Sequence, residues 1–320
     1  MRVLLTGSSG WLGRYLALLL RSAGHRVIGL DVAPGEETQV LGSVADHEVV
    51  SRAFVEFRPQ AVIHAGALHK PDIARHPARA FIDVNVAGTL NLLEAAVAAR
   101  HDRFVFTSTT SLMISQTILD ETATVADWLD ESSGPILPRN IYGISKYAAE
   151  QLCRLYWQQH GLSCVVLRTA RFFPEEDHTR RALSGENRKA NELLHRRLTV
   201  EDAARAHLAA LVHAPALGFE TLIVSAPTPF SRAERAELKA DARAVIARHF
   251  PDAAALYRQR GWTLPASIGR VYDASRAERV LGWRARTDFA ALLMAMRLGD
   301  PLPFAHRPGY VSPPAAAQPR

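Results

Sequence analysis

The sequence predicts an α/β fold: a doubly wound parallel sheet covered by helices on both faces, with a smaller C-terminal lid. Two observations predict it. Short apolar, strand-like runs alternate with longer helix-like runs through the first half of the chain, which is the pattern of parallel strands joined by crossover helices. After about residue 169 the alternation stops and a polar, charged segment begins. We therefore expect a regular sheet domain followed by a less regular region.

The individual elements follow from the apolar runs and from residues typical of helix ends. Gly161 follows a helix expected to end near His160, the usual position of a C-terminal glycine. Thr199 is a candidate N-cap, and Ser231 with Glu234 forms a capping-box pattern. The expected strands are residues 2–7, 26–31, 61–66, 103–108, 163–169 and 220–226, and the expected helices are residues 11–23, 46–57, 79–99, 142–160 and 199–213.

These elements predict how the chain is divided. We expect residues 1–169, completed by residues 197–226, to form the sheet domain. Residues 170–196 and 227–307 are expected to form the lid, where a substrate would bind. Residues 308–320 end in "SPPAAAQPR", a Pro- and Ala-rich tail that we expect to be disordered.

Composition and charge exclude several classes of protein. The 320-residue chain has a net charge of +6, but its arginines are spread through helix-like runs without a nucleic-acid motif, so a small anionic ligand accounts for the charge better. The run "LALLL" is too short to cross a bilayer, and the start has no signal-peptide layout. Cys153 and Cys164 have neither disulfide nor metal-ligand spacing. We expect a cytoplasmic protein without a metal, a membrane partner or bound nucleic acid.

A glycine-rich loop joins the first expected strand to the first expected helix. "LLTGSSGWLGRYLALLL" places Gly7, Gly10 and Gly13 three residues apart. Gly7 permits a tight turn, Gly10 lets a phosphate approach the backbone, and Gly13 lets the helix pack close to the sheet. Such a loop can be an ordinary turn, but the strand before it and the helix after it favour a Rossmann-type dinucleotide site.

An acidic residue follows at the place that such a site requires. Asp31 closes the second expected strand, where a carboxylate can accept hydrogen bonds from the ribose hydroxyls of NAD and would repel the 2′-phosphate of NADP. A solvated turn residue before Pro34 is the alternative interpretation. Together with the glycine loop, Asp31 predicts NAD as the cofactor.

A tyrosine and a lysine are paired near the middle of the chain. "YGISK" places Tyr142 and Lys146 four residues apart, on one face of an expected helix. A free tyrosine has a pKa of about 10, and a nearby ammonium group lowers it by stabilising the phenolate. The pair can therefore donate and accept a proton near neutral pH, although Tyr-x-x-x-Lys also occurs by chance on exposed helices.

In their order and spacing these motifs resemble an extended short-chain dehydrogenase/reductase of the NAD-dependent epimerase/dehydratase family, the group of the UDP-galactose 4-epimerases. The resemblance runs from residue 1 to about residue 283. Its further motifs are "GSVAD" (42–46), "HAGA" (64–67), "NVAGTLNLLEAA" (85–96), "FVFTSTTS" (104–111), "TVEDAARAHLAAL" (199–211) and "ASRAERVLGW" (274–283).

The resemblance implies roles for individual residues. Tyr142 is the catalytic acid/base, Lys146 lowers its pKa and binds the ribose, and Thr109 holds the reacting oxygen. Asn85 supports the geometry of the active site, whereas His64 is more simply a core histidine. The implied substrate contacts are Ser108, Thr109 and Arg171. The implied cofactor contacts are Gly7, Ser9, Gly10, Trp11, Leu12, Gly13, Asp31, Ser43, Val44, Ala65, Gly66, Ala67, Asn85, Thr107, Tyr142, Lys146 and Thr169.

The sequence departs from the family pattern mainly around the substrate. Ser43 replaces an Asp that touches adenine, and Thr110 with Ser111 replaces the Asp-Glu of the 4,6-dehydratases. After the strand at 163–169, Arg171 or Phe173 stands where the family has an Asn near the substrate phosphates. The nucleotide-linked sugar is therefore implied by the family and not by these residues.

These observations lead to three hypotheses about function. The first is an NAD-dependent epimerase-type enzyme acting on a nucleotide-linked sugar. The second is an NAD-dependent sugar or alcohol dehydrogenase with net oxidation, and the third is a non-catalytic NAD(H)-binding sensor. A hydrolase is not supported, because G-x-S-x-G and H-E-x-x-H are both absent from the sequence. The resemblance also implies a homodimer formed through the helices matching residues 84–99 and 142–160.

Overall fold

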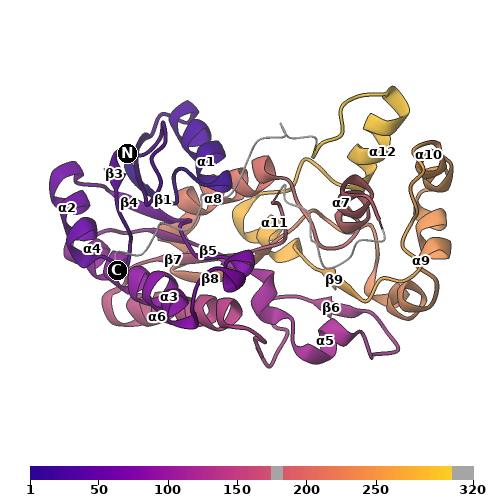
Figure 1. The fold of residues 1–320 in the computed structure, drawn as a ribbon, viewed down its shortest axis with the longest axis horizontal. Helices are drawn as coiled ribbons and strands as arrows, with labels where there is room; N and C mark the ends of the chain where they lie inside the picture. Colours follow the sequence, from indigo (N-terminus) through magenta and orange to yellow (C-terminus); the bar gives the residue numbers. More distant parts are fainter. Residues whose placement is uncertain (174–182, 305–320) are drawn as a thin grey trace.

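The structure is a computed structural model that describes residues 1–173 and 183–304. Its centre is a parallel sheet in the order β3-β2-β1-β4-β5-β7-β8 (Figure 1). The order reverses between β1 and β4, where ligands of such sheets bind beyond the carboxyl ends of the strands. The predicted fold class is confirmed. The strands are β1 (Arg2–Thr6), β2 (Arg26–Asp31), β3 (Val40–Leu41), β4 (Ala61–His64), β5 (Phe104–Thr109), β7 (Cys164–Thr169) and β8 (Phe219–Val224).

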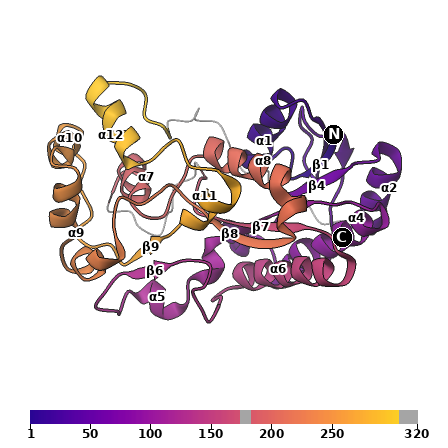
Figure 2. The same ribbon diagram turned by 180° about the vertical axis from the view of Figure 1, so that it is seen from behind.

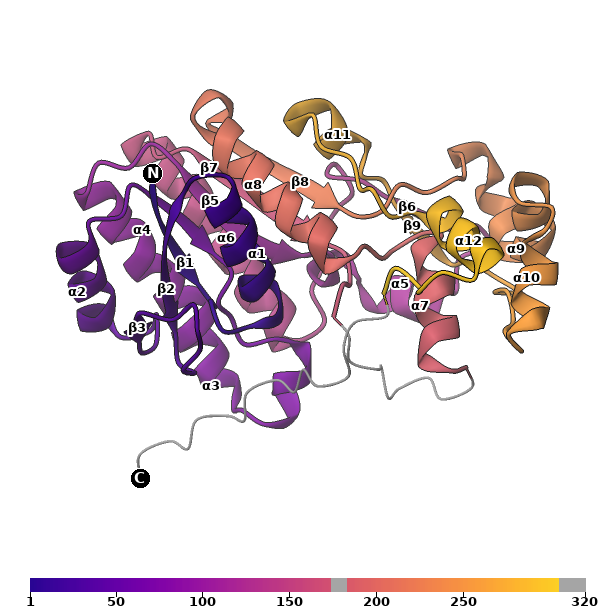
Figure 3. The ribbon, with the colours of Figure 1, turned by 90° about the horizontal axis from the view of Figure 1, so that it is seen from above.

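Helices cover both faces of the sheet, and α1 and α8 lie side by side on one of them (Figure 3). In β5, Val105 packs on the side of α1 and α8, whereas Phe104 and Phe106 pack on the other side. Burial on both faces explains why the strands read as nearly continuous apolar runs. The covering helices are α1 (Trp11–Ser22) and α8 (Val200–Leu217) on one face, and α2 (His47–Phe57), α4 (Gly88–Ala98) and α6 (Ile141–His160) on the other.

The ends of the helices follow the expected chemistry. The side chain of Asn140 accepts a hydrogen bond from the Gly143 amide at 2.9 Å and so caps the start of α6. Gly161 ends that helix with a φ of +68°, in the left-handed region that favours glycine. The side chain of Thr199 accepts from the Asp202 amide at 3.2 Å and caps α8. The predicted boundaries at Gly161 and Thr199 are confirmed.

One helical run is apolar enough to raise the question of a membrane. Ala78–Ala98 comprises α3 (Ala78–Phe81), a π-helical stretch η2 (Ile82–Ala87) and α4, and by length and composition it could cross a bilayer. Leu92 and Leu93 of this run are fully buried against the sheet. Packing in the core accounts for these apolar residues.

The lid lies at the end of the molecule away from α2 and β3 (Figures 1 and 2). Its small parallel sheet pairs β6 with β9. β6 therefore belongs to the lid, although it lies within the sheet domain predicted over residues 1–169. Ser231 and Glu234 form the predicted capping box. Residues 174–182 and 305–320, including the tail predicted to be disordered, lie outside the described residues. The lid elements are β6 (Asp127–Leu129), α7 (Gly185–Leu193), η4 (Arg232–Glu234), α9 (Arg235–His249), α10 (Ala253–Gln259), β9 (Arg270–Tyr272), α11 (Ser275–Leu281) and α12 (Phe289–Leu298).

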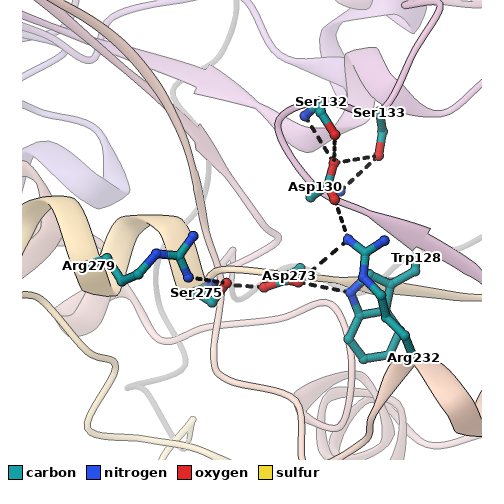
Figure 4. Close-up of polar contacts among 8 residues, drawn as sticks. All are labelled: Trp128, Asp130, Ser132, Ser133, Arg232, Asp273, Ser275 and Arg279. Atoms are coloured by element: carbon teal, nitrogen blue, oxygen red, sulfur yellow. Dashed lines mark hydrogen bonds and ion pairs between the residues drawn. The ribbon is translucent and has the colours of Figure 1, made fainter.

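Polar contacts hold the small sheet to the segment before α9 (Figure 4). Arg232 pairs with Asp130, which follows β6, and lies 3.8 Å from Asp273, which follows β9. The Trp128 indole donates to the Asp273 carboxylate at 2.9 Å. A cavity of about 270 Å³ opens beside these residues. Because Arg232 is already paired with both carboxylates, we assign this cluster a structural role.

A buried ionic network joins β5, α6 and β7. Arg168 of β7 donates from Nη2 to Oε2 of Glu150 at 2.7 Å and from Nε to Oε1 at 3.0 Å. Ser108 of β5 donates to the same carboxylate at 2.5 Å. The side chains of Arg168 and Glu150 are 7% and 2% exposed, so neither charge can be hydrated if its partner is removed.

Replacing Arg168 by Met tests this network. The Arg168→Met variant leaves the Glu150 charge buried without its partner, and we expect the free energy of unfolding to fall by about 3–5 kcal/mol in urea denaturation. Arg79→Met is the matched control, because it breaks the exposed pair with Asp83 and should cost less than about 1 kcal/mol. Equal losses in the two variants would show that the network does not stabilise the core.

Candidate active site

In the glycine loop the backbone around Gly7 lies close both to the segment after β4 and to the start of α1. Gly7 has a φ of +73°, and a Cβ at this position would lie 2.7 Å from the Gly66 amide nitrogen. A Cβ on Gly13 would lie 2.0 Å from the Gly7 carbonyl oxygen, so only glycine lets α1 start this close to β1. The side chains of Trp11 and Leu12 are buried, which leaves their backbone as the part able to face a ligand at the start of α1.

Asp31 lies beside this loop, at the carboxyl end of β2. Its carboxylate accepts hydrogen bonds from the Ser9 amide and the Ala33 amide, both at 2.9 Å. The Ser9 hydroxyl donates to the Ala33 carbonyl at 2.9 Å, which ties the glycine loop to the turn after β2. Each carboxylate oxygen keeps a further lone pair, so Asp31 can still accept from a ribose hydroxyl.

The end of β4 contains a chain of hydrogen bonds around a buried histidine. The His64 ring contacts the Thr6 hydroxyl at 2.7 Å and the Thr89 hydroxyl at 3.1 Å. The Gly66 amide donates to the Thr6 hydroxyl at 3.0 Å, which places Ala65, Gly66 and the following Ala67 against the glycine loop. Burial, with a smaller effect of Lys146, holds the pKa of His64 well below its usual range. His64 is a neutral core histidine.

Asn85 lies in the π-helical stretch η2, and its side chain makes hydrogen bonds to other residues of the protein. Its side chain accepts from the Leu68 amide at 2.8 Å and donates to the Leu68 carbonyl and the Ser145 hydroxyl, both at 3.0 Å. Asn85 therefore ties the loop after β4 to α6. π-Helical turns often mark functional sites, and the contacts of this residue give it the supporting role that we expected.

The three predicted catalytic side chains come together at one edge of the sheet. Thr109 ends β5, and Tyr142 and Lys146 lie in the first turns of α6. Thr109, Tyr142 and Lys146 are 9%, 8% and 3% exposed. The Thr109 hydroxyl accepts a hydrogen bond from the Ser111 amide at 3.0 Å and lies close enough to the Tyr142 phenol to affect its pKa. The Lys146 ammonium group lies 4.1 Å from the centre of the Phe106 ring, a favourable cation–π contact.

The proton affinities of this group differ from the sequence-based expectation. Burial raises the pKa of Tyr142 to about 12, although the hydrogen bond from Thr109 opposes the shift. Burial also lowers the pKa of Lys146 to about 7, against the effects of Cys153 and Glu150. The expected lowering of the tyrosine pKa is therefore not found, because burial outweighs the effect of Thr109 and the Asp72 carboxylate adds to the rise.

Several residues expected at the site have other partners. The Ser108 hydroxyl points into the interior and donates to Glu150, which corrects its assignment as a substrate contact. The Thr107 hydroxyl bonds to His207 of α8 at 2.8 Å, and Thr169 donates to the Ser108 carbonyl at 3.0 Å. These three hydroxyls fix the ends of β5 and β7.

The remaining predicted contacts are also engaged locally. Ser43 accepts from the Ala45 amide at 3.1 Å, and the buried Val44 follows it in the turn before α2. Arg171, expected at the substrate, lies 4.0 Å from the carboxylate of Glu192 in α7. These contacts leave the proposed roles of Ser43, Val44 and Arg171 untested.

Sequence reasoning missed His69, which lies beside Tyr142 and also contacts Phe173, the residue expected near the substrate phosphates. The His69 ring lies with its centre 6.3 Å from that of Tyr142 and 5.1 Å from that of Phe173. His69 is in an irregular segment and Phe173 follows β7, so neither belongs to a periodic pattern. The only signal was the position of His69 five residues after the end of β4.

The chain is similar to a known family of proteins. A model of the NAD-dependent epimerase/dehydratase family matches residues 3–220, which is more than half of the chain. The chain belongs to this family. Proteins similar to this chain are epimerases, dehydratases and dehydrogenases, and the cofactor of the family is NAD.

The relatives that this chain resembles have different activities. The chain is 31% identical over 173 residues to a UDP-glucose 4-epimerase of Rhizobium meliloti, covering 52% of this chain and 50% of that protein. It is 33% identical over 172 residues to an L-arabinose 1-dehydrogenase (NAD(P)(+)) of Haloferax volcanii, covering 52% of this chain and 65% of that protein. The matched part thus spans about half to two thirds of these relatives.

A solved structure gives a longer match. A short-chain dehydrogenase/reductase superfamily protein of Agrobacterium tumefaciens, solved with bound NAD, superposes with a TM-score of 0.64 at 23% identity, covering 93% of this chain and 98% of that one. At this identity the likeness shows the shared fold.

The residues at the sheet edge of this family member fit NAD. The cradle formed by Gly7 and Gly13 is open only because neither carries a Cβ, and Gly10, between them, forms the N-cap of α1. Asp31 stands beside the cradle with acceptor capacity left. Together they match a site for a pyrophosphate at a helix N-terminus and a ribose at the end of β2.

Two alanine variants distinguish an effect on NAD binding from an effect on the stability of the fold. In Gly10→Ala the new Cβ lies 3.1 Å from the Gly7 carbonyl oxygen, so the loop needs only a small adjustment, but the methyl group stands where a phosphate approaches. We expect a nearly unchanged unfolding midpoint and an NAD affinity reduced about tenfold or more, followed by protein fluorescence. Gly13→Ala forces α1 away from the sheet and should lower both. NAD binding by Gly10→Ala at wild-type strength would place the pyrophosphate elsewhere.

Proposed function

We propose that this chain is an epimerase-type oxidoreductase acting on a nucleotide-linked sugar, in which Tyr142 exchanges a proton with a sugar hydroxyl. The convergence of Thr109, Tyr142 and Lys146 carries the proposal. These buried polar side chains lie at the same sheet edge as the glycine loop. A protein that only sensed NAD would need neither a buried phenol nor a threonine hydroxyl beside it. Their presence argues against the sensor hypothesis.

The roles of the three side chains follow from their chemistry. Because the Thr109 hydroxyl lies next to the Tyr142 phenol, both can contact one substrate oxygen. Tyr142 takes the proton of that hydroxyl or returns it. Lys146 lies one helical turn away, and because burial lowers its pKa to about 7 it can release or take up a proton near neutral pH. Bound NAD supplies the hydride acceptor and, when oxidised, a positive charge that favours the phenolate.

Net oxidation of a sugar is the second candidate, and two observations support it. One relative is an L-arabinose 1-dehydrogenase of similar identity to the epimerase relatives. Arg171, a position from which a substrate phosphate could be bound, instead lies close to Glu192. The chemical step at Tyr142 is the same for both activities, since an epimerase oxidises and then reduces the same carbon.

A substrate panel with matched variants tests the proposal. Protein and NAD are incubated with UDP-, dTDP- and GDP-sugars and with free aldoses, and NADH absorbance and product NMR are recorded. An inverted carbon without net NADH is the result expected for an epimerase, and accumulating NADH identifies a dehydrogenase. We expect Tyr142→Phe to lower kcat about 10²–10⁴-fold while leaving NAD affinity unchanged. Failure to turn over any sugar would overturn the proposal.

We also propose that the protein is a cytoplasmic homodimer formed through α4 and α6. Ile144 and Leu155 of α6 are 46% and 39% exposed and lie three helical turns apart on one face. Exposed apolar residues in a row are typical of a surface that meets another protein.

A negative charge introduced on the exposed face of α6 should prevent the two subunits from associating. We expect Leu155→Glu to lower the mass measured by light scattering from that of a dimer to that of a monomer, because the carboxylate would be desolvated in the interface. Val212→Glu is the control, since Val212 lies on α8, on the other face of the sheet, and is 56% exposed. A wild-type monomer, or a dimer that survives Leu155→Glu, would contradict this assembly.

A further inference from the structure

His69 is held in a fixed place beside the catalytic tyrosine by its backbone. The preceding residue, Leu68, has both its amide and its carbonyl bound by the Asn85 side chain. The His69 amide itself donates to the Asp72 carboxylate at 2.6 Å. These contacts fix the backbone of the segment, and the His69 side chain is held as well because it takes part in a capping box with Asp72.

The ring forms a wall with two other aromatic side chains. Its plane is inclined by 61° to that of Tyr142 and by 66° to that of Phe173, which are edge-to-face arrangements. Phe173 is stacked on the buried Phe172 with ring centres 4.7 Å apart, so packing against the core holds the Phe173 ring in place. One ring nitrogen of His69 accepts from the Asp72 backbone amide in a capping box, which leaves the other ring nitrogen for a ligand.

The charge of this histidine limits what it can bind. Burial lowers the pKa of His69 to about 4, and Lys146 and Arg75 act in the same direction, whereas Asp72 opposes them. The imidazole is therefore neutral at pH 7. A neutral imidazole nitrogen donates or accepts one hydrogen bond and has no net attraction for a carboxylate or a phosphate.

We propose that His69 is a specificity-determining residue that hydrogen-bonds an uncharged hydroxyl next to the carbinol on which Tyr142 acts, with Phe173 packed against the sugar ring. This inference rests on the proposed function, because it takes a sugar as the substrate. It defines the substrate more closely: the carbon beside the reacting one carries a hydroxyl and not an acidic group.

A pair of substrates and a pair of variants test the role of His69. The substrates are the sugar turned over by the wild type and its deoxy analogue lacking the neighbouring hydroxyl. We expect the wild type to prefer the parent sugar by about 10- to 100-fold in kcat/KM, because the bound analogue would cover a ring nitrogen of His69 without giving it a hydrogen-bond partner. His69→Phe keeps the aromatic contacts but not the nitrogen, so the preference should disappear. His69→Gln should restore part of it.

Controls distinguish this role from a structural one. His69→Phe should bind NAD and unfold as the wild type does, and His213→Phe, an exposed position on α8, should keep the full preference. His69→Leu replaces His69→Phe if the phenyl ring does not fit. A wild-type preference in a folded His69→Phe or His69→Leu variant that turns over the sugar would overturn the inference and leave the proposed function standing. Absence of turnover of every sugar by the wild type would overturn both.

Discussion

The active site depends on how α6 is fixed against the sheet. Tyr142, Lys146 and Glu150 are spaced four residues apart, so they lie along one face of the helix. Glu150 is bound by Arg168 of β7 and Ser108 of β5, and Ser108 directly precedes Thr109. The ionic network therefore sets the register in which Tyr142 meets Thr109. A buried ion pair adds little stability compared with well-packed apolar residues, so positioning is its more important effect.

Burial that positions these side chains also sets their proton affinities. The Lys146 ammonium group faces the Phe106 ring, and its pKa falls to about 7. Tyr142 holds its proton up to a pKa of about 12. The site is thus a phenol that holds its proton beside a lysine that readily loses its charge. A phenol of this kind becomes a base only when positive charge is placed next to it, so its proton transfer depends on the charge of its neighbours.

The sequence predicted the features that depend on local pattern. Alternating apolar runs gave the parallel sheet, and the spacing of Gly7, Gly10 and Gly13 located the cradle. Long-range pairing was beyond the pattern: β6 and β9 have three residues each and are separated by 140 residues of chain, so no periodicity announces them. The direction of the Ser108 side chain was missed for a related reason, because its hydroxyl donates to Glu150, a residue that is distant in sequence.

Charge near the end of β7 shows why substrate choice is the hardest property to predict. The sequence places several arginines there, which favours an anionic ligand. In the structure Glu192 is almost fully buried, and burial would raise its pKa, but Arg196, Arg197 and Arg171 together hold that pKa below its usual value. The carboxylate is therefore ionised and draws these cations to itself. Part of the positive charge thus serves the fold, and recognition next to Tyr142 falls to neutral groups such as His69 and Phe173.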